Sequence, residues 1–231
     1  MTDARDTPNP SPEPDGLCPT CGKPDLLCVC ADVEPVENRI SVLVLQHPQE
    51  QDKTLGSARL LTHILKRADF RIGLSWPSLA KALGRPADPK RWAVLHLGSI
   101  QAKDFPGDAD IALFDPKGVA LPDQSNALKG LEGVILFDGT WSQAKTLWWR
   151  NAWVLKARRI ALRPMQPSLY GALRKEPRRE GLSTIEAAGM VLARLEDNPE
   201  IESELRGAFS IMLARYRAAR KAGKVAKPSE A

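Results

Sequence analysis

The sequence predicts an α/β domain with a mostly parallel sheet flanked by helices, preceded by a small cysteine-rich segment. Three observations carry this prediction. Apolar runs alternate with segments of helical periodicity, all four cysteines fall between residues 18 and 30, and 43% of the residues are apolar, enough for a core without disulfides. Strands separated by helices form parallel sheets covered on both faces.

The chain is expected to divide into four parts. Residues 1–16 are rich in Pro, Asp and Glu and are expected to be a disordered tail, and 223–231 a frayed one. Residues 17–38 would be the cysteine-rich segment and 39–222 one larger domain. The chain lacks a basic and apolar leader and any apolar run of about 18 residues, so we expect a cytoplasmic protein without a membrane span.

The elements follow from the apolar pattern. The segment 39–47 is an almost continuous apolar run, as a strand covered on both faces requires. Leucines at helical spacing predict a helix at 57–68. A short helix is expected after Pro77. Further strands are expected at 70–76, 91–98, 109–115, 133–138 and 157–163, and further helices at 141–150, 183–197 and 200–222.

The four cysteines form the pattern "CPTCGKPDLLCVC". Cys18, Cys21, Cys28 and Cys30 can place four thiolates around one tetrahedral zinc ion. Two disulfides are an alternative that does not suit a cytoplasmic chain, and reduced or redox-active thiols are another. The segment is expected to be structural in each case, because four thiolates would leave zinc no open position for a substrate.

Positive charge is concentrated in the C-terminal part of the chain. Residues 141–231 contain 18 Lys and Arg against 9 Asp and Glu, whereas residues 1–140 contain 15 against 19. Such a basic half favours a polyanionic partner, and nucleic acid is the one we expect. A solvated surface that keeps the protein soluble is the alternative.

The candidate functional residues are those that directly follow the strands, because ligands of open α/β sheets bind beyond the strands' carboxyl ends. His47 follows the first strand, Asp115 the fourth, and "DGTW" (138–141) the fifth. Asp138 can be a functional carboxylate or the N-cap of the next helix. Trp141 can stack on a base or pack in the core, and His47 can be a ligand contact or a turn residue.

The long basic loop 167–187 ends in the capping-box pattern "STIE". Ser183, Thr184 and Glu186 can therefore form a helix cap or a cofactor pocket, since a helix N-terminus also binds carboxylates and phosphates. The sequence contains no Gly-x-Gly-x-x-Gly, no Walker loop and no second metal-ligand cluster, so nucleotide binding of the usual kinds is not supported.

Four ordered segments resemble the DTW-domain family. They are the cysteine cluster, "LQHPQE" (45–50), Asp138-Gly139-Thr140-Trp141 in "LFDGTWSQAKTL", and "PSLYGALRKEPRREGLSTIEAAG" (167–189). The resemblance implies a tRNA-uridine aminocarboxypropyltransferase of the SPOUT-related, trefoil-knotted α/β class. Such enzymes use S-adenosylmethionine to place a 3-amino-3-carboxypropyl group on N3 of a tRNA uridine, and methylthioadenosine is the by-product.

These expectations assign the following residues. Asp138, Thr140 and Trp141 are the expected catalytic residues, with Asp138 as base or orienting acceptor. The expected S-adenosylmethionine contacts are His47, Leu136, Phe137, Leu182, Ser183, Thr184 and Glu186. Arg174, Lys175, Arg178 and Arg179 are expected to contact tRNA phosphates, or else to form only a solvated loop. Structural zinc is the expected metal, and no protein partner is evident. A methyltransferase of the same fold and a non-catalytic zinc-containing RNA-binding protein are the alternatives.

Overall fold

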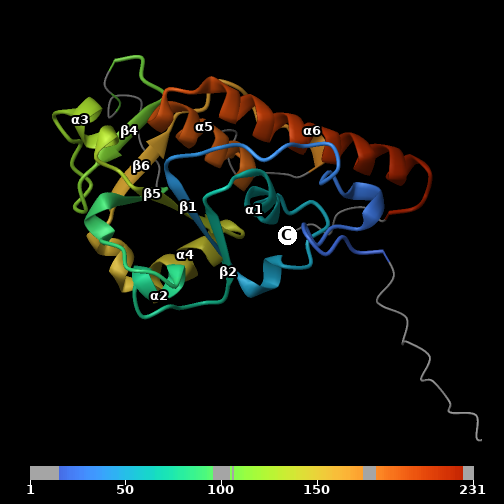
Figure 1. The fold of residues 1–231 in the computed structure, drawn as a ribbon, viewed down its shortest axis with the longest axis horizontal. Coiled ribbons are helices and arrows are strands. Elements are labelled where there is room, and N and C mark those ends of the chain that lie inside the picture. Colours follow the sequence, from blue (N-terminus) through green and yellow to red (C-terminus); the bar gives the residue numbers. More distant parts are fainter. Residues whose placement is uncertain (1–15, 96–104, 106, 174–180, 226–231) are drawn as a thin grey trace, which may run out of the picture.

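A computed structural model of the chain describes residues 16–95, 105, 107–173 and 181–225. Its central feature is a six-stranded sheet in the order β2-β1-β5-β3-β6-β4 (Figure 1). The strands are β1 (Ser41–Gln46), β2 (Ala68–Ile72), β3 (Trp92–Leu95), β4 (Ile111–Phe114), β5 (Gly133–Asp138) and β6 (Arg158–Leu162). Among these described strands, β4 runs antiparallel to β6 and all other neighbouring pairs are parallel. The predicted mostly parallel sheet is therefore confirmed.

The strands β1 and β5 are buried along their whole length. Side chains alternate between the faces of a strand, so Val42 and Val44 join one hydrophobic cluster and Leu43 and Leu45 the other. The two strands pair in parallel from Ser41–Gly133 to Gln46–Asp138. Both strands therefore end at the same edge of the sheet, each on a polar residue.

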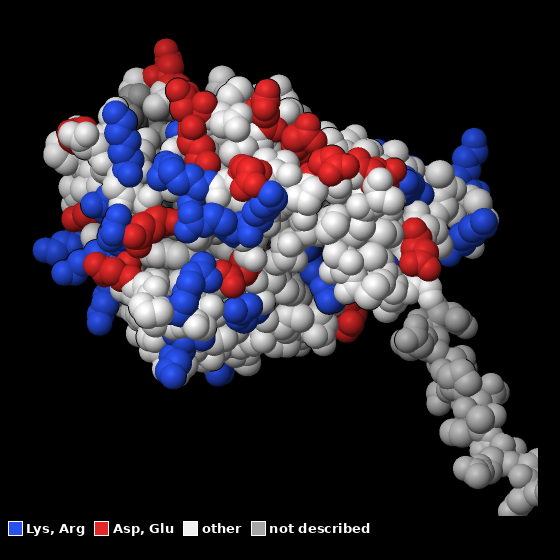
Figure 2. Space-filling view, viewed as in Figure 1, with Lys and Arg blue, Asp and Glu red and all other residues white. Residues whose placement is uncertain are grey.

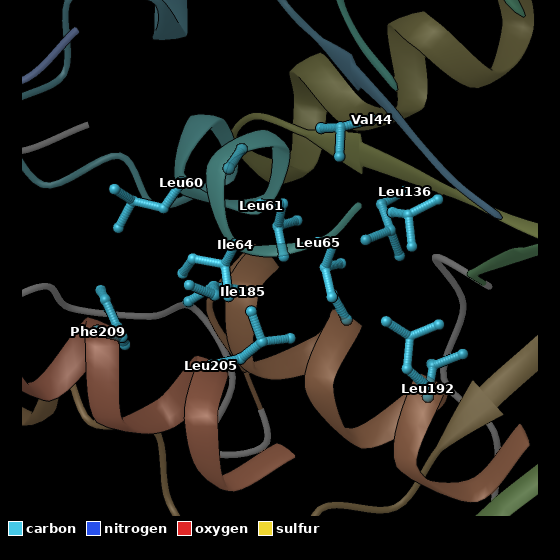
Figure 3. Close-up of a cluster of buried hydrophobic side chains, with 14 of the residues drawn as sticks. Val44, Leu60, Leu61, Ile64, Leu65, Leu136, Ile185, Leu192, Leu205 and Phe209 are labelled. Atoms are coloured by element: carbon cyan, nitrogen blue, oxygen red, sulfur yellow. The ribbon is translucent and has the colours of Figure 1, made fainter. Parts of the chain in front are cut away.

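Helices cover both faces of this sheet. They are α1 (Leu61–Ile64), α2 (Leu79–Leu83), α3 (Gln124–Lys129), α4 (Trp141–Arg150), α5 (Thr184–Glu196) and α6 (Pro199–Lys221). α1, α5 and α6 pack on the face of Val44, and α2 and α4 on the face of Leu45 (Figure 1). Figure 3 shows Leu61 and Leu65 between the sheet residues Val44 and Leu136 and the helices α5 and α6.

The predicted helix at 57–68 is wrong over much of its length. A 3-10 turn at Ala58–Leu60 leads into α1, which ends at Ile64. Leu65 is already extended and forms a bridge with Val36, and β2 begins at Ala68, opposite Val42. Pairing with the buried strand β1 therefore overrides the local helical periodicity. The short helix α3 was not predicted, and part of the strand expected at 91–98 lies outside the described residues.

The helices predicted at 141–150, 183–197 and 200–222 are confirmed to within two residues. α6 begins after Asn198, whose side chain accepts a hydrogen bond from the Glu200 N–H, and Pro199 occupies the first helical position. None of the helices that the structure describes combines the length and the apolar character needed to cross a bilayer.

The cysteine-rich segment packs on α6. Its side chains Cys18, Cys21, Leu27 and Val29 are buried in the same cluster as that helix. Arg215 of α6 donates a hydrogen bond to the carbonyl of Cys28 and pairs with Asp32 at 2.8 Å. The segment thus shares its core with the larger domain. The two predicted tails lie outside the described residues, apart from Gly16 and 223–225.

Candidate active site

Asp138 ends β5 with its carboxylate held from two other elements. Its Oδ2 accepts a hydrogen bond of 2.8 Å from Gln46 Nε2 at the end of β1. Its Oδ1 accepts a hydrogen bond from the Thr184 hydroxyl at the start of α5. The residue is 9% exposed. The carboxylate is therefore fixed in orientation by contacts that reach across 92 and 46 residues of sequence.

Thr140, and not Asp138, caps the following helix. The Thr140 hydroxyl accepts a hydrogen bond from the Gln143 N–H at 3.4 Å, and the Gln143 side chain accepts one from the Thr140 N–H at 2.6 Å. This reciprocal pair is a capping box. The N-cap alternative for Asp138 is therefore wrong, because α4 already has its cap.

The turn between β5 and α4 is tight. A Cβ on Gly139 would lie 2.9 Å from the Cβ of Gln143 and 3.4 Å from that of His47, so only glycine fits without a shift. The His47 N–H donates to the Asp138 carbonyl at 2.9 Å. This close approach joins the ends of β1 and β5 and fixes where the Asp138 side chain emerges.

Trp141 and His47 flank this turn. Trp141, the first residue of α4, is 40% exposed, so its ring is at the surface and the core alternative is wrong. His47 caps the short turn Pro48–Glu50, because its Nδ1 accepts a hydrogen bond from the Gln49 N–H at 3.3 Å. His47 is thus a turn residue, and its contact with a cofactor stays a prediction.

Ser183 and Glu186 form the predicted capping box of α5. Glu186 is 1% exposed and lies in a dense network of protein contacts. Its carboxylate accepts hydrogen bonds from the hydroxyls of Ser168 and Ser183, both at 2.6 Å, and pairs with Arg206 at 3.1 Å. These contacts give Glu186 a structural role within the described residues.

The other predicted cofactor contacts differ in their surroundings. Leu136 and Phe137 are buried in the hydrophobic clusters on opposite faces of the sheet. Leu182 is partly exposed and directly precedes the α5 cap. The basic residues Arg174, Lys175, Arg178 and Arg179 lie outside the described residues. Contacts of all these residues with a cofactor or RNA remain predictions.

A polar hollow of about 170 Å³ opens beside Gln46, whose side chain donates a hydrogen bond to Asp138. Lys23, Glu50 and Arg59 line it together with Gln46. Burial lowers the pKa of Lys23 to about 8, and the negative charge of Asp138 opposes that shift. The hollow thus brings the end of the first strand and the cysteine-rich segment to one place.

The four cysteines have the geometry of a metal site. All four sulfur atoms lie within 4.8 Å of one another, and Cys18–Cys30 and Cys21–Cys28 are each 3.8 Å apart. Tetrahedral zinc with bonds of about 2.3 Å to sulfur separates its ligands by about 3.8 Å, so the cluster fits zinc. The sulfurs are too far apart for disulfides, and all four thiols are free.

The thiols differ in their affinity for protons. The backbone N–H of Cys21 lowers the pKa of Cys18 to about 6. Burial raises the pKa of Cys21 to about 11 and also raises the pKa of Cys30. A metal ion that binds all four as thiolates would therefore displace protons from the two latter residues.

The family model of the DTW domain matches residues 15–217. The chain belongs to the DTW-domain family. It is similar to proteins named tRNA-uridine aminocarboxypropyltransferase 2, with 26% identity over 190 residues in Macaca fascicularis, 26% over 195 in Mus musculus and 27% over 191 in Drosophila melanogaster. Each alignment covers 81% of this chain, but 59%, 59% and 70% of those proteins. No solved structure matches the chain.

Three polar residues that line the hollow of this DTW domain are not among the site residues that the sequence predicts. The position of Gln46 indicates a site residue, since it is a polar residue that ends an otherwise apolar strand. Glu50 lies in the "LQHPQE" segment but was not assigned a role. Lys23 carried no signal beyond its place between two cysteine pairs, because only the folded chain brings it to the hollow.

A second, basic hollow of about 410 Å³ lies at the opposite edge of the DTW domain's sheet, where β1 and β3 begin. The cations that line it are Arg39, Arg67, Arg85, Arg91 and Lys129. Figure 2 shows Lys and Arg side chains on this part of the surface, mixed with acidic ones. Glu132 pairs with Arg91 at 2.6 Å, and Asp69 pairs with Arg85 at 2.7 Å, so part of the positive charge is neutralised.

Proposed function

We propose that this protein transfers the 3-amino-3-carboxypropyl group of S-adenosylmethionine to N3 of a tRNA uridine. The observation that carries the proposal is the Asp138 carboxylate, fixed by Gln46 and Thr184 beside a polar hollow. The names of the similar proteins supply the reaction class. The chain spans about 59% of the length of two of them.

The role of Asp138 follows from the chemistry of uridine. N3 carries a weakly acidic imide proton and must lose it before the nitrogen can attack carbon. Asp138 accepts that proton or orients the imide, as a carboxylate at a strand end is suited to do. The N3–carbon bond then forms as the carbon–sulfur bond breaks, and the electron pair of the broken bond stays on sulfur.

The remaining residues bind and orient the two substrates. S-adenosylmethionine supplies an activated carbon beside its sulfonium, and the protein must present the aminocarboxypropyl carbon rather than the methyl group to N3. We assign binding of the cofactor to His47 and to Leu182 beside the α5 cap, and stacking on a base or adenine to the exposed ring of Trp141.

We extend the proposal to the RNA, to the metal and to the fold. The residues Arg174, Lys175, Arg178 and Arg179 hold tRNA phosphates, which carry no sequence information. The four cysteines hold one structural zinc ion, which their spacing fits. We also propose, from the resemblance to DTW proteins, that the domain belongs to the SPOUT-related class.

Incubation with total tRNA and S-adenosylmethionine, followed by nucleoside mass spectrometry, tests the function. Transfer of the aminocarboxypropyl group adds about 101 Da to uridine, whereas methylation adds about 14 Da. Asp138→Asn should abolish the larger product while tRNA binding is retained. An increment of 14 Da would identify a methyltransferase instead, and tRNA binding without any modified nucleoside would indicate a non-catalytic RNA-binding protein.

Asp115→Asn is the matched control. Asp115 also follows a strand, but β4 is antiparallel, so this aspartate lies at the opposite edge of the sheet. Its carboxylate accepts hydrogen bonds from the N–H groups of Lys117 and Val119 in its own turn. Equal loss of transfer in both variants would remove the special role proposed for Asp138.

A further inference from the structure

Glu50 has a buried carboxylate oxygen that the protein does not satisfy. The residue is 5% exposed, and its Oε1 has no hydrogen-bond partner among the described residues. Leaving a buried acceptor unpaired costs about 1–3 kcal/mol, and more for a charged group. Because Glu50 lines the polar hollow beside Gln46, a cationic or N–H-bearing ligand in that hollow would satisfy this oxygen.

Lys23 supplies the opposite charge in the same hollow. It is 6% exposed, and its ammonium donates hydrogen bonds of 3.0 Å to the carbonyls of Lys53 and Thr54. An ammonium group has three N–H donors. The third is thus available to a ligand that enters the hollow, because those two carbonyls are its acceptors among the described residues.

The two charged groups do not neutralise each other. No ion pair joins Lys23 to Glu50 in the described part of the chain, although both line one hollow. Gln46 lines it as well and donates to the Asp138 carboxylate, so the hollow lies next to the proposed reaction centre. A ligand that carries both an anionic and a cationic group would complement this arrangement.

We propose that the hollow is a subsite for an α-amino acid group, in which Glu50 binds its ammonium and Lys23 its carboxylate. The inference rests on the proposed function, since the aminocarboxypropyl end of S-adenosylmethionine is such a group. When both charges hold this end, its sulfur-bonded carbon is directed toward Asp138. The aminocarboxypropyl carbon, and not the methyl group, is then presented for transfer. The cysteine-rich segment then contributes a residue to the site, in addition to its structural role.

Calorimetric titration with three ligands tests each charge separately. S-adenosylmethionine carries both groups, decarboxylated S-adenosylmethionine keeps only the ammonium, and methylthioadenosine has neither. Lys23→Met should weaken the binding of S-adenosylmethionine about 10- to 100-fold and leave the affinity for the decarboxylated ligand unchanged. Glu50→Gln should weaken the binding of S-adenosylmethionine and of its decarboxylated form to a similar extent. Neither variant should change the affinity for methylthioadenosine, which also shows that each variant is folded.

The exposed pair Lys66 and Glu37 gives matched controls with the same side-chain types. Lys66→Met and Glu37→Gln should bind all three ligands as the wild type does. The subsite is refuted if Lys23→Met and Glu50→Gln bind S-adenosylmethionine with normal affinity. It is also refuted if their affinity for methylthioadenosine falls as much as their affinity for S-adenosylmethionine. A wild-type protein that binds no S-adenosylmethionine would instead refute the proposed function, and the subsite with it.

Discussion

Replacing Thr184 by Val removes a hydrogen bond to Asp138 while keeping the shape of the side chain. Val has no hydroxyl, so Oδ1 of Asp138 loses the donor that α5 supplies. A hydrogen bond to a charged group contributes about 1.5–3 kcal/mol. If that energy holds the carboxylate in its productive orientation, kcat should fall about 10- to 100-fold. Steady-state kinetics of tRNA modification, with both substrates varied, measures this effect.

The same experiment separates two roles of Thr184. A residue that only positions Asp138 lowers kcat and leaves the KM for S-adenosylmethionine unchanged, whereas a cofactor-binding residue raises that KM. Ser183 remains as the helix cap, so α5 should keep its stability. Thr146→Val is the control, because the Thr146 hydroxyl bonds only the Ser142 carbonyl of its own helix among the described contacts. Normal kcat with a raised KM would refute the positioning role.

Three further predictions concern metal, stability and RNA. Zinc should copurify at about one ion per chain by metal analysis, and Cys18→Ser should lower both the zinc content and the thermal midpoint. Glu186→Gln should lower the unfolding free energy by about 1.5–3 kcal/mol in denaturant titrations, because it removes the charge of a buried carboxylate that pairs with the partly buried Arg206; a loss below about 0.5 kcal/mol would contradict this. Alanine at the four basic residues of 174–179 should reduce the slope of log affinity against log salt by up to about 0.9 per phosphate contact, and coinciding slopes would show that the loop contacts no phosphates.

The sequence alone predicts the structure correctly where local and tertiary preferences agree. The segment 133–150 is such a case, because an apolar run, a glycine turn and helical spacing all specify strand, turn and helix. β5 and α4 have the predicted limits. The sequence also identified the capping box of Ser183 and Glu186, since a capping box depends on residues only three positions apart.

Prediction was weaker where distant segments compete for the same residues. Leucines at 57–68 have helical spacing, yet Ala68 pairs with β1 and ends the helical stretch early. Gln46 and Thr184 meet at Asp138 only because β1, β5 and α5 converge at one edge of the sheet. No pattern within one segment could indicate that Lys23 would line the same hollow.

The order of the strands explains why the candidate site forms where it does. β5 lies between β1 and β3, so the Asp138 carboxylate emerges beside the end of β1 and next to Gln46. The chain then turns into α4 through Gly139, and Thr140 satisfies the helix terminus. Because the cap is supplied by Thr140, both carboxylate oxygens of Asp138 remain available to groups outside its own loop. Asp138 at the end of β5 is thus suited to bind or deprotonate a substrate, because Gly139 makes the turn and Thr140 caps the helix.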